Sequence, residues 1–155
     1  MELKTQVIAG EGRQDLMITR EFDLPVKLLF KAHADPGIIE QWMGTKVLKL
    51  ESKKQGSYQF ETSDGKGNMA FRANGVIHDF IPESKITRTF EMEGTPFGVQ
   101  LEIYEFEQLG DNTSRLNLHV IYESAEKRNQ VLKLPFAQGI NMAHNRLQDI
   151  AGKLK

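Results

Sequence analysis

Apolar and polar side chains alternate along much of the chain, and a period of two predicts β-strands. Leu16, Ile18 and Phe22 alternate with polar neighbours in a first strand that ends at Asp23. Residues 4–9 carry a similar pattern and are followed by the turn-like sequence GEGRQD. We therefore expect this N-terminal segment to pair with the first strand.

From Thr45 to Tyr122 the alternation continues and is interrupted by turn residues. This segment predicts about five consecutive strands, most simply an antiparallel meander, because short turns join strands that pair with each other. The whole chain should then hold six or more antiparallel strands. The predicted turns lie at Gln55-Gly56, Asp64 to Gly67, Pro82 to Ser84, Gly94 to Pro96 and Gly110 to Asn112.

Two short helices are predicted between the first strand and the remaining strands. Pro25 suits the first position of a helix, and Asp35 followed by Pro36 is a second start signal. Gly44 should end the second helix, since glycine readily adopts the left-handed conformation found at helix ends.

A long amphipathic helix is predicted from about Ser124 to Leu154, with Ser124 as its cap and a kink at Pro135. Its apolar residues recur every three or four positions, at Leu132, Phe136, Ile140, Ala143, Leu147 and Ile150. We expect Gly139 and Ala143 on this same face. Two such small side chains leave space against the sheet, which could be a ligand cavity or a close backbone contact.

Composition indicates one globular domain over residues 1–155, with residues 1–14 as a possible extra strand and turn. The net charge is −1 and the basic residues are scattered, which argues against nucleic acid and anionic membranes as partners. Cysteine is absent, so disulfides and thiolate chemistry are excluded. No apolar run is long enough for membrane insertion and no secretory signal is evident, so we expect a cytoplasmic protein.

Four segments together resemble the family named after the activator of the 90-kDa heat-shock-protein ATPase, in the START-like superfamily. They are ITREFDLPVKLLFKAHADPGIIEQWMG, GVIHDFIP, RTFEMEGTP and YESAEKRNQVLKLPFAQGINMAHNRL, in the family's order. The resemblance implies an α+β helix-grip fold, in which a curved antiparallel sheet holds a long C-terminal helix over an internal cavity. The chain departs from the family pattern at Glu51 to Gly56 and at Leu134-Pro135-Phe136.

Catalytic and metal-binding motifs are not found. The four histidines, His33, His78, His119 and His144, fit no ligand spacing, and we interpret them as solvated or at a cavity rim, with the face of His78 left open. There is no nucleophile elbow, phosphate-binding loop or dinucleotide fingerprint. We therefore predict no catalytic residue, no metal and no cofactor.

Charged residues on inward-facing positions carry more information. Arg88 alternates with Ile86 and Phe90, and Glu102 with Tyr104. Arg20 likewise alternates with inward apolar residues. A buried charge must be paired, so Arg88 should contact either Glu102 or the polar end of a ligand, unless it lies at a strand end where its head reaches water. The candidate binding residues are Trp42, Phe60, Arg88, Phe90, Tyr104, Phe136, Gly139, Ile140 and Ala143.

Three functions are compatible with these features. The first is a domain that binds a small apolar, aromatic or lipid-like molecule between sheet and helix. The second is an enzyme of the polyketide cyclase or aromatase type, which could act by shaping a substrate and supplying one acid or base. The third is a co-chaperone that binds a chaperone.

Overall fold

A computed structural model describes residues 3–63 and 69–155. The predicted turn from Asp64 to Gly67 lies outside the described residues. Within them, the strands are β1 (Gln6–Ile8), β2 (Asp15–Phe22), β3 (Lys46–Leu50), β4 (Ser57–Ser63), β5 (Met69–Ile81), β6 (Lys85–Met92), β7 (Val99–Gly110) and β8 (Thr113–Ile121). The helices are α1 (Val26–Ala34), α2 (Pro36–Met43), α3 (Ala125–Leu132) and α4 (Phe136–Gly152).

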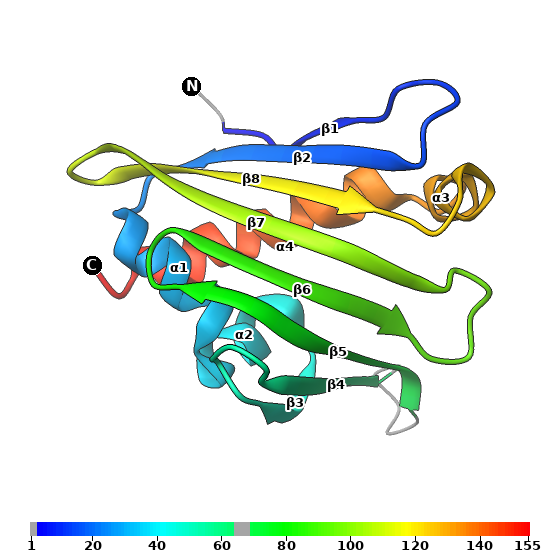
Figure 1. Ribbon diagram of the computed structural model, residues 1–155. Coiled ribbons are helices and arrows are strands. Elements are labelled where there is room, and N and C mark those ends of the chain that lie inside the picture. The colour runs from blue at the N-terminus through cyan, green and yellow to red at the C-terminus, as the bar shows by residue number, and fades with distance from the viewer. Residues whose placement is uncertain (1–2, 64–68) are drawn as a thin grey trace.

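The strands form one antiparallel sheet in the order β1-β2-β8-β7-β6-β5-β4-β3. From β3 to β8 each strand pairs with the next one, which confirms the predicted meander. β2 then pairs along its whole length with β8, from Asp15 opposite Ile121 to Phe22 opposite Ser114. Figure 1 shows α4 crossing behind the sheet, with α1 and α2 at one end of it and α3 at the other. The predicted α+β helix-grip fold is confirmed.

The helices between β2 and β3 begin and end close to the expected residues. Pro25 precedes α1 as its cap rather than occupying the first helical position, and its carbonyl accepts hydrogen bonds from Leu28 and Leu29. The Asp35 side chain caps α2 by accepting from two backbone N–H groups, at 2.9 Å and 3.2 Å. Gly44 follows α2 with a φ of 65°, the left-handed conformation that glycine adopts without strain.

The prediction of one C-terminal helix from Ser124 to Leu154 is wrong. The segment forms two helices, α3 and α4, separated by residues 133–135. Pro135 has no N–H to donate, and its ring would collide with the carbonyl of Val131 in a continuous helix. That carbonyl instead accepts a hydrogen bond from Leu134 at 3.1 Å, which tightens the end of α3. Ser124 caps α3 as expected, by accepting from Lys127.

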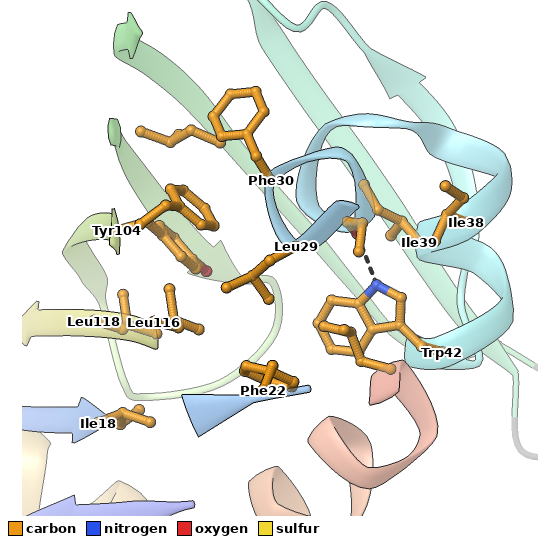
Figure 2. Packing of buried hydrophobic residues seen from close by; sticks show 14 of the residues in the cluster. Ile18, Phe22, Leu29, Phe30, Ile38, Ile39, Trp42, Tyr104, Leu116 and Leu118 are labelled. Carbon is orange, nitrogen blue, oxygen red and sulfur yellow. Dashed lines mark hydrogen bonds between the residues drawn. The ribbon is translucent and has the colours of Figure 1, made fainter. Parts of the chain in front are cut away.

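The core lies on the concave side of the sheet, where α1 and α2 insert between the strands and α4. Figure 2 shows Leu29 and Phe30 of α1 beside Phe22, Leu116 and Tyr104 of the sheet. Trp42 of α2 is buried, and its indole N–H donates to the Ala32 carbonyl at 2.8 Å. This bond fixes α2 against α1 and gives the only polar atom of the Trp42 side chain a partner.

The two edge strands are both short. β1 has 3 residues, and β3 has 5 with an irregularity between Val47 and Lys49. In the described part of the chain, no helix combines the length and the hydrophobicity needed to cross a bilayer.

Candidate functional site

A cavity of about 290 Å³ lies between the concave face of the sheet and the four helices, α1 to α4. Strands β2, β4, β6, β7 and β8 form its floor. Its apolar lining includes Ile18, Ile39, Trp42, Phe60, Phe90, Phe97, Leu118, Val120, Phe136 and Ile140. A largely apolar cavity with a few polar groups is the usual form of a small-molecule site, although the volume of this one is just below the usual range.

Eight of the nine candidate residues from the sequence line this cavity. They are Trp42, Phe60, Arg88, Phe90, Tyr104, Phe136, Ile140 and Ala143. They come from five elements, and the folding of the sheet brings them together.

Gly139 does not line the cavity, contrary to expectation. It is exposed, and a Cβ added there would meet no atom within 4 Å apart from its chain neighbours and the backbone of its own helix. Each helical residue advances by about 100° around the axis, so the centre of the buried face decides which positions point inward. The sequence interpretation placed His144 on the polar side, but His144 and Ala151 are buried. Because these two residues are buried, the inward face of α4 is centred away from Gly139. Ala143 lies at the edge of this face.

A buried ion pair forms the polar wall of the cavity. Arg88 and Glu102 lie directly opposite each other on β6 and β7. Nε of Arg88 donates to Oε1 of Glu102 at 2.8 Å, and the two side chains are 12% and 8% exposed. Of the two partners left open for Arg88, the structure thus contains the protein carboxylate.

Neighbouring side chains complete the hydrogen bonding of this pair. Nη2 of Arg88 donates to the Tyr104 hydroxyl at 2.7 Å, and that hydroxyl donates to Oε1 of Glu102 at 3.0 Å. Gln100 donates to the other carboxylate oxygen at 2.7 Å. Both oxygens of Glu102 are therefore satisfied, which is the condition under which a buried charge is tolerated.

Aromatic rings hold the guanidinium in place. The Arg88 Cζ lies 4.7 Å from the Tyr58 ring centroid and 4.9 Å from that of Tyr104. The Tyr58 hydroxyl donates to the Thr89 carbonyl. Tyr58 can approach β5 and β6 so closely because a glycine, Gly75, faces it, and any Cβ there would collide with the Tyr58 ring and the Thr89 carbonyl.

Electrostatics keep Arg88 charged. Burial works to lower the pKa of Arg88, but the oxygens of Tyr104, Tyr58 and Glu102 outweigh it and raise the pKa above its ordinary value. Burial also raises the pKa of the Tyr104 hydroxyl well above its ordinary value. Tyr104 is therefore a neutral hydrogen-bond donor at physiological pH, and Arg88 is a permanent cation.

Two of the histidines that the sequence placed in solvent or at a cavity rim, His33 and His144, line the cavity. His144 is buried, at 2% exposed, and His33 is partly buried. Burial lowers the pKa of His33 to about 4, although its bond to Leu29 acts in the opposite direction. Burial, with the nearby His33 and Arg20, lowers the pKa of His144 to about 3. Both rings are thus neutral at physiological pH. His78 is exposed, which answers the question left open by the sequence.

His33 is held in one orientation. Its Nδ1 lies 2.9 Å from the Leu29 carbonyl oxygen, one helical turn earlier. Its ring packs edge-on against Trp42 and Phe106 at centroid distances of 5.4 Å and 5.2 Å. A carbonyl oxygen only accepts hydrogen bonds, so Nδ1 carries the proton and Nε2 is left as an acceptor.

His144 belongs to a different polar group. Its Nδ1 lies 2.8 Å from Thr5 Oγ1, and its ring contacts Phe22 edge-on. Arg20, which is buried as its inward phase predicted, donates to Asn145 at 2.7 Å. These contacts connect the N-terminal segment and β2 to α4.

The cavity approaches the surface beside the break between α3 and α4. Leu134 lines it and is 50% exposed, and Phe97 lines it from the segment between β6 and β7. The Glu123 carboxylate clamps that segment to α3, because its Oε1 accepts from Val99 N at 3.1 Å and Lys127 Nζ at 2.9 Å.

Sequence reasoning missed several lining residues, including His33, Phe97, Tyr122, Leu134 and His144. A signal existed for His33, since it follows the buried Leu29 by four residues and so shares its helical face. No comparable signal exists for Phe97 or Leu134, which lie in irregular segments. Among residues 3–63 and 69–155, no group of three His, Asp or Glu side chains is placed to hold a metal ion.

Solved structures with the same fold come from several bacteria. A protein from Rhodobacter sphaeroides is 19% identical, with a TM-score of 0.84 over 99% of this chain and 100% of its own. One from Mycobacterium smegmatis is 22% identical, with a TM-score of 0.83 over 95% and 96%. A third, from Arthrobacter aurescens, is 18% identical, with a TM-score of 0.85 over 96% and 91%. At these identities the likeness shows the fold alone.

No curated protein gives a significant match to the chain. A family model does match, from residue 23 to residue 152, and its description is activator of Hsp90 ATPase homolog 1-like protein. The matched segment includes all the cavity-lining residues except Ile18. The resemblance seen in the sequence is therefore confirmed, and the chain belongs to the activator of Hsp90 ATPase homolog 1-like family.

Proposed function

We propose that this protein binds a small apolar or aromatic molecule in the cavity between sheet and helices. The observation that carries the proposal is a cavity of about 290 Å³ whose apolar walls end in one ordered polar group, Arg88 with Glu102 and Tyr104. Apolar walls supply affinity and a fixed polar group supplies orientation.

The loose packing of the residues around the cavity supports a binding role. Phe90, Phe136 and Ile140 are only partly buried although they face inward, so the folded chain forgoes contacts that a tighter core would make. A ligand would restore those contacts. Incomplete packing of this kind is expected in a protein whose cavity binds another molecule.

The experiment measures ligand affinity and thermal stability in two matched variants of α4. Ala143 lines the cavity, whereas Gly139 lies one turn earlier and is exposed. Ala143→Leu should fill the cavity and lower the affinity for hydrophobic compounds at least tenfold. Gly139→Leu adds a larger side chain outside the cavity and should leave the affinity unchanged.

The starting compounds come from native mass spectrometry of the freshly purified protein and from a thermal-shift screen of hydrophobic small molecules. Wild-type protein without affinity for any of them would contradict the proposal. Equal affinity of the Ala143→Leu and wild-type proteins would place binding elsewhere. The mass of each bound compound should be unchanged after incubation; a changed mass would favour the enzyme alternative, for which the neutral His33 is a candidate base.

A chaperone is the second candidate partner, because the family description names activation of the Hsp90 ATPase. An activator of this kind would use its surface. Stimulation of a chaperone ATPase should then be the same for the Ala143→Leu and wild-type proteins, whereas ligand binding should differ between them.

A further inference from the structure

The ion pair in the cavity is complete without a ligand. Arg88 and Glu102 are the cavity-lining residues that carry charge at neutral pH among the described residues, and their charges cancel. A ligand carboxylate beside them would have no cation of its own and would face the Glu102 carboxylate across a dehydrated site. A ligand cation would meet the corresponding problem with Arg88. The cavity therefore favours an uncharged molecule.

His33 presents an unused acceptor to the same space. Its Nδ1–H is donated to Leu29, and its Nε2 has no hydrogen-bond partner among the described residues. That atom is not sealed within the protein, and the side chain lines the cavity. The ring is also 5.6 Å from the Tyr104 ring, so it lies next to the polar wall formed by Arg88.

His144 is a weaker candidate for this role. Its Nδ1 contacts a hydroxyl, Thr5 Oγ1, which can donate or accept, so its remaining nitrogen has no fixed role. Its side chain is also almost fully buried, at 2% exposed. Among the cavity nitrogens, His33 Nε2 is the one whose acceptor role is set by the backbone.

We propose that the cavity selects uncharged ligands that carry a hydroxyl group, and that this hydroxyl donates its hydrogen to Nε2 of His33. This inference rests on the proposed function, because it names the chemistry of the ligand that the cavity would hold. His33 is then a specificity-determining residue. A ligand without a donor leaves this acceptor unpaired in an apolar site, and an anionic ligand meets Glu102.

Three probes of one shape separate these effects: naphthalene, 2-naphthol and 2-naphthoate. Their affinities for the full chain are measured at pH 7.5 by titration calorimetry. We expect 2-naphthol to bind about tenfold more tightly than naphthalene, as one buried hydrogen bond allows. We expect 2-naphthoate to bind at least tenfold more weakly than 2-naphthol.

Variants at His33 assign the preference to this residue. His33→Phe keeps an aromatic ring but removes the acceptor, so 2-naphthol should fall to the affinity of naphthalene, while naphthalene changes less than about twofold. His33→Gln keeps an acceptor oxygen and should retain part of the preference. His78→Phe makes the same change at an exposed histidine and should alter none of the affinities.

The outcomes distinguish this inference from the proposed function. Equal binding of naphthalene and 2-naphthol by the wild-type protein would overturn the inference and leave the proposed function standing. Tighter binding of 2-naphthoate than of 2-naphthol would overturn the inference that the Arg88–Glu102 pair disfavours a charged ligand. Retention of the 2-naphthol preference by His33→Phe would overturn the role of His33. Failure of all three probes to bind the wild-type protein would contradict both proposals. The order of the three affinities for the wild-type protein tests the ligand preference even if a variant does not fold.

Discussion

The groove between the sheet and the helices is filled at one end and hollow at the other. At the filled end, Phe22, Leu29, Leu116 and Leu147 are each 0% exposed. At the hollow end, inward-facing residues such as Phe90 and Phe136 remain partly exposed to the cavity. Both ends use the same kinds of side chain.

The difference comes from the elements that cover each end. At the filled end, two helices, α1 and α2, contribute side chains to the core between the sheet and α4. The hollow end is covered by the junction of α3 and α4, where Pro135 interrupts the helix and residues 133–135 are exposed. Hydrophobic patterning indicates which residues face inward, but the spacing of the covering backbone decides whether they meet one another.

The largest effect is expected at the ion pair of the hollow end. Arg88→Met should destabilise the protein by about 3–5 kcal/mol, because Glu102 would remain as an uncompensated buried carboxylate. Adding Glu102→Gln should recover most of this loss, since the carboxylate is then neutral. Denaturant unfolding of the two single variants and the double variant measures the coupling. Additive effects of the two substitutions would show that the pair is not energetically coupled.

A pair of truncations on α4 compares the two ends directly. Leu147→Ala at the filled end should cost about 2–5 kcal/mol, because it removes fully buried atoms and leaves a void. Ile140→Ala faces the existing cavity and should cost about 1 kcal/mol, since fewer contacts are lost. Urea unfolding of both variants gives the two values. Equal costs would mean that the hollow end is as tightly packed as the filled end.

The histidines should make stability dependent on pH. An unfolded histidine takes up a proton near pH 6.5, whereas His33 and His144 do so in the folded state only near pH 4 and pH 3. The unfolded state therefore binds more protons between these values, and stability falls as the pH falls below about 6.5. Each histidine should lower the free energy of unfolding by about 1.5 kcal/mol between pH 6.5 and pH 5.

Chemical unfolding across this pH range tests the effect, with His33→Phe and His144→Phe each expected to reduce the slope. Above pH 7.5 both histidines are neutral in either state, so the variants and the wild-type protein should share the same flat dependence. An unchanged slope below pH 6.5 in both variants would contradict the assignment of neutral, buried rings.

Much of the fold could be predicted because its signals are local. The alternation in β2, the Asp35 cap and the Gly44 terminator each act within a few residues, and each appears as expected. The break at Pro135 was partly predictable. Proline excludes a continuous hydrogen-bond pattern, but whether the helix bends or stops depends on the rest of the structure.

The site was less predictable because it depends on packing between distant segments. His33 and His144 have polar neighbours in sequence, and their positions in the cavity wall follow from the way α1 and α4 meet β2, β7 and α2. Gly139 was misplaced for the same reason, since the buried His144 changes the inward face of α4. The pairing of Arg88 with Glu102 is one of the interpretations that strand phase allows, and the register of β6 and β7 places the two residues opposite each other.

The edge strands of the sheet also affect whether molecules of this protein associate with each other. Unpaired edge strands can recruit strands from other molecules, and proteins limit this by keeping edges short, irregular or charged. Here one edge is the 3-residue β1, and the other is β3, which carries Lys46 and Lys49 and is interrupted by its irregularity. An open sheet of this size can thus hold a hydrophobic groove without offering long edges for intermolecular strand addition.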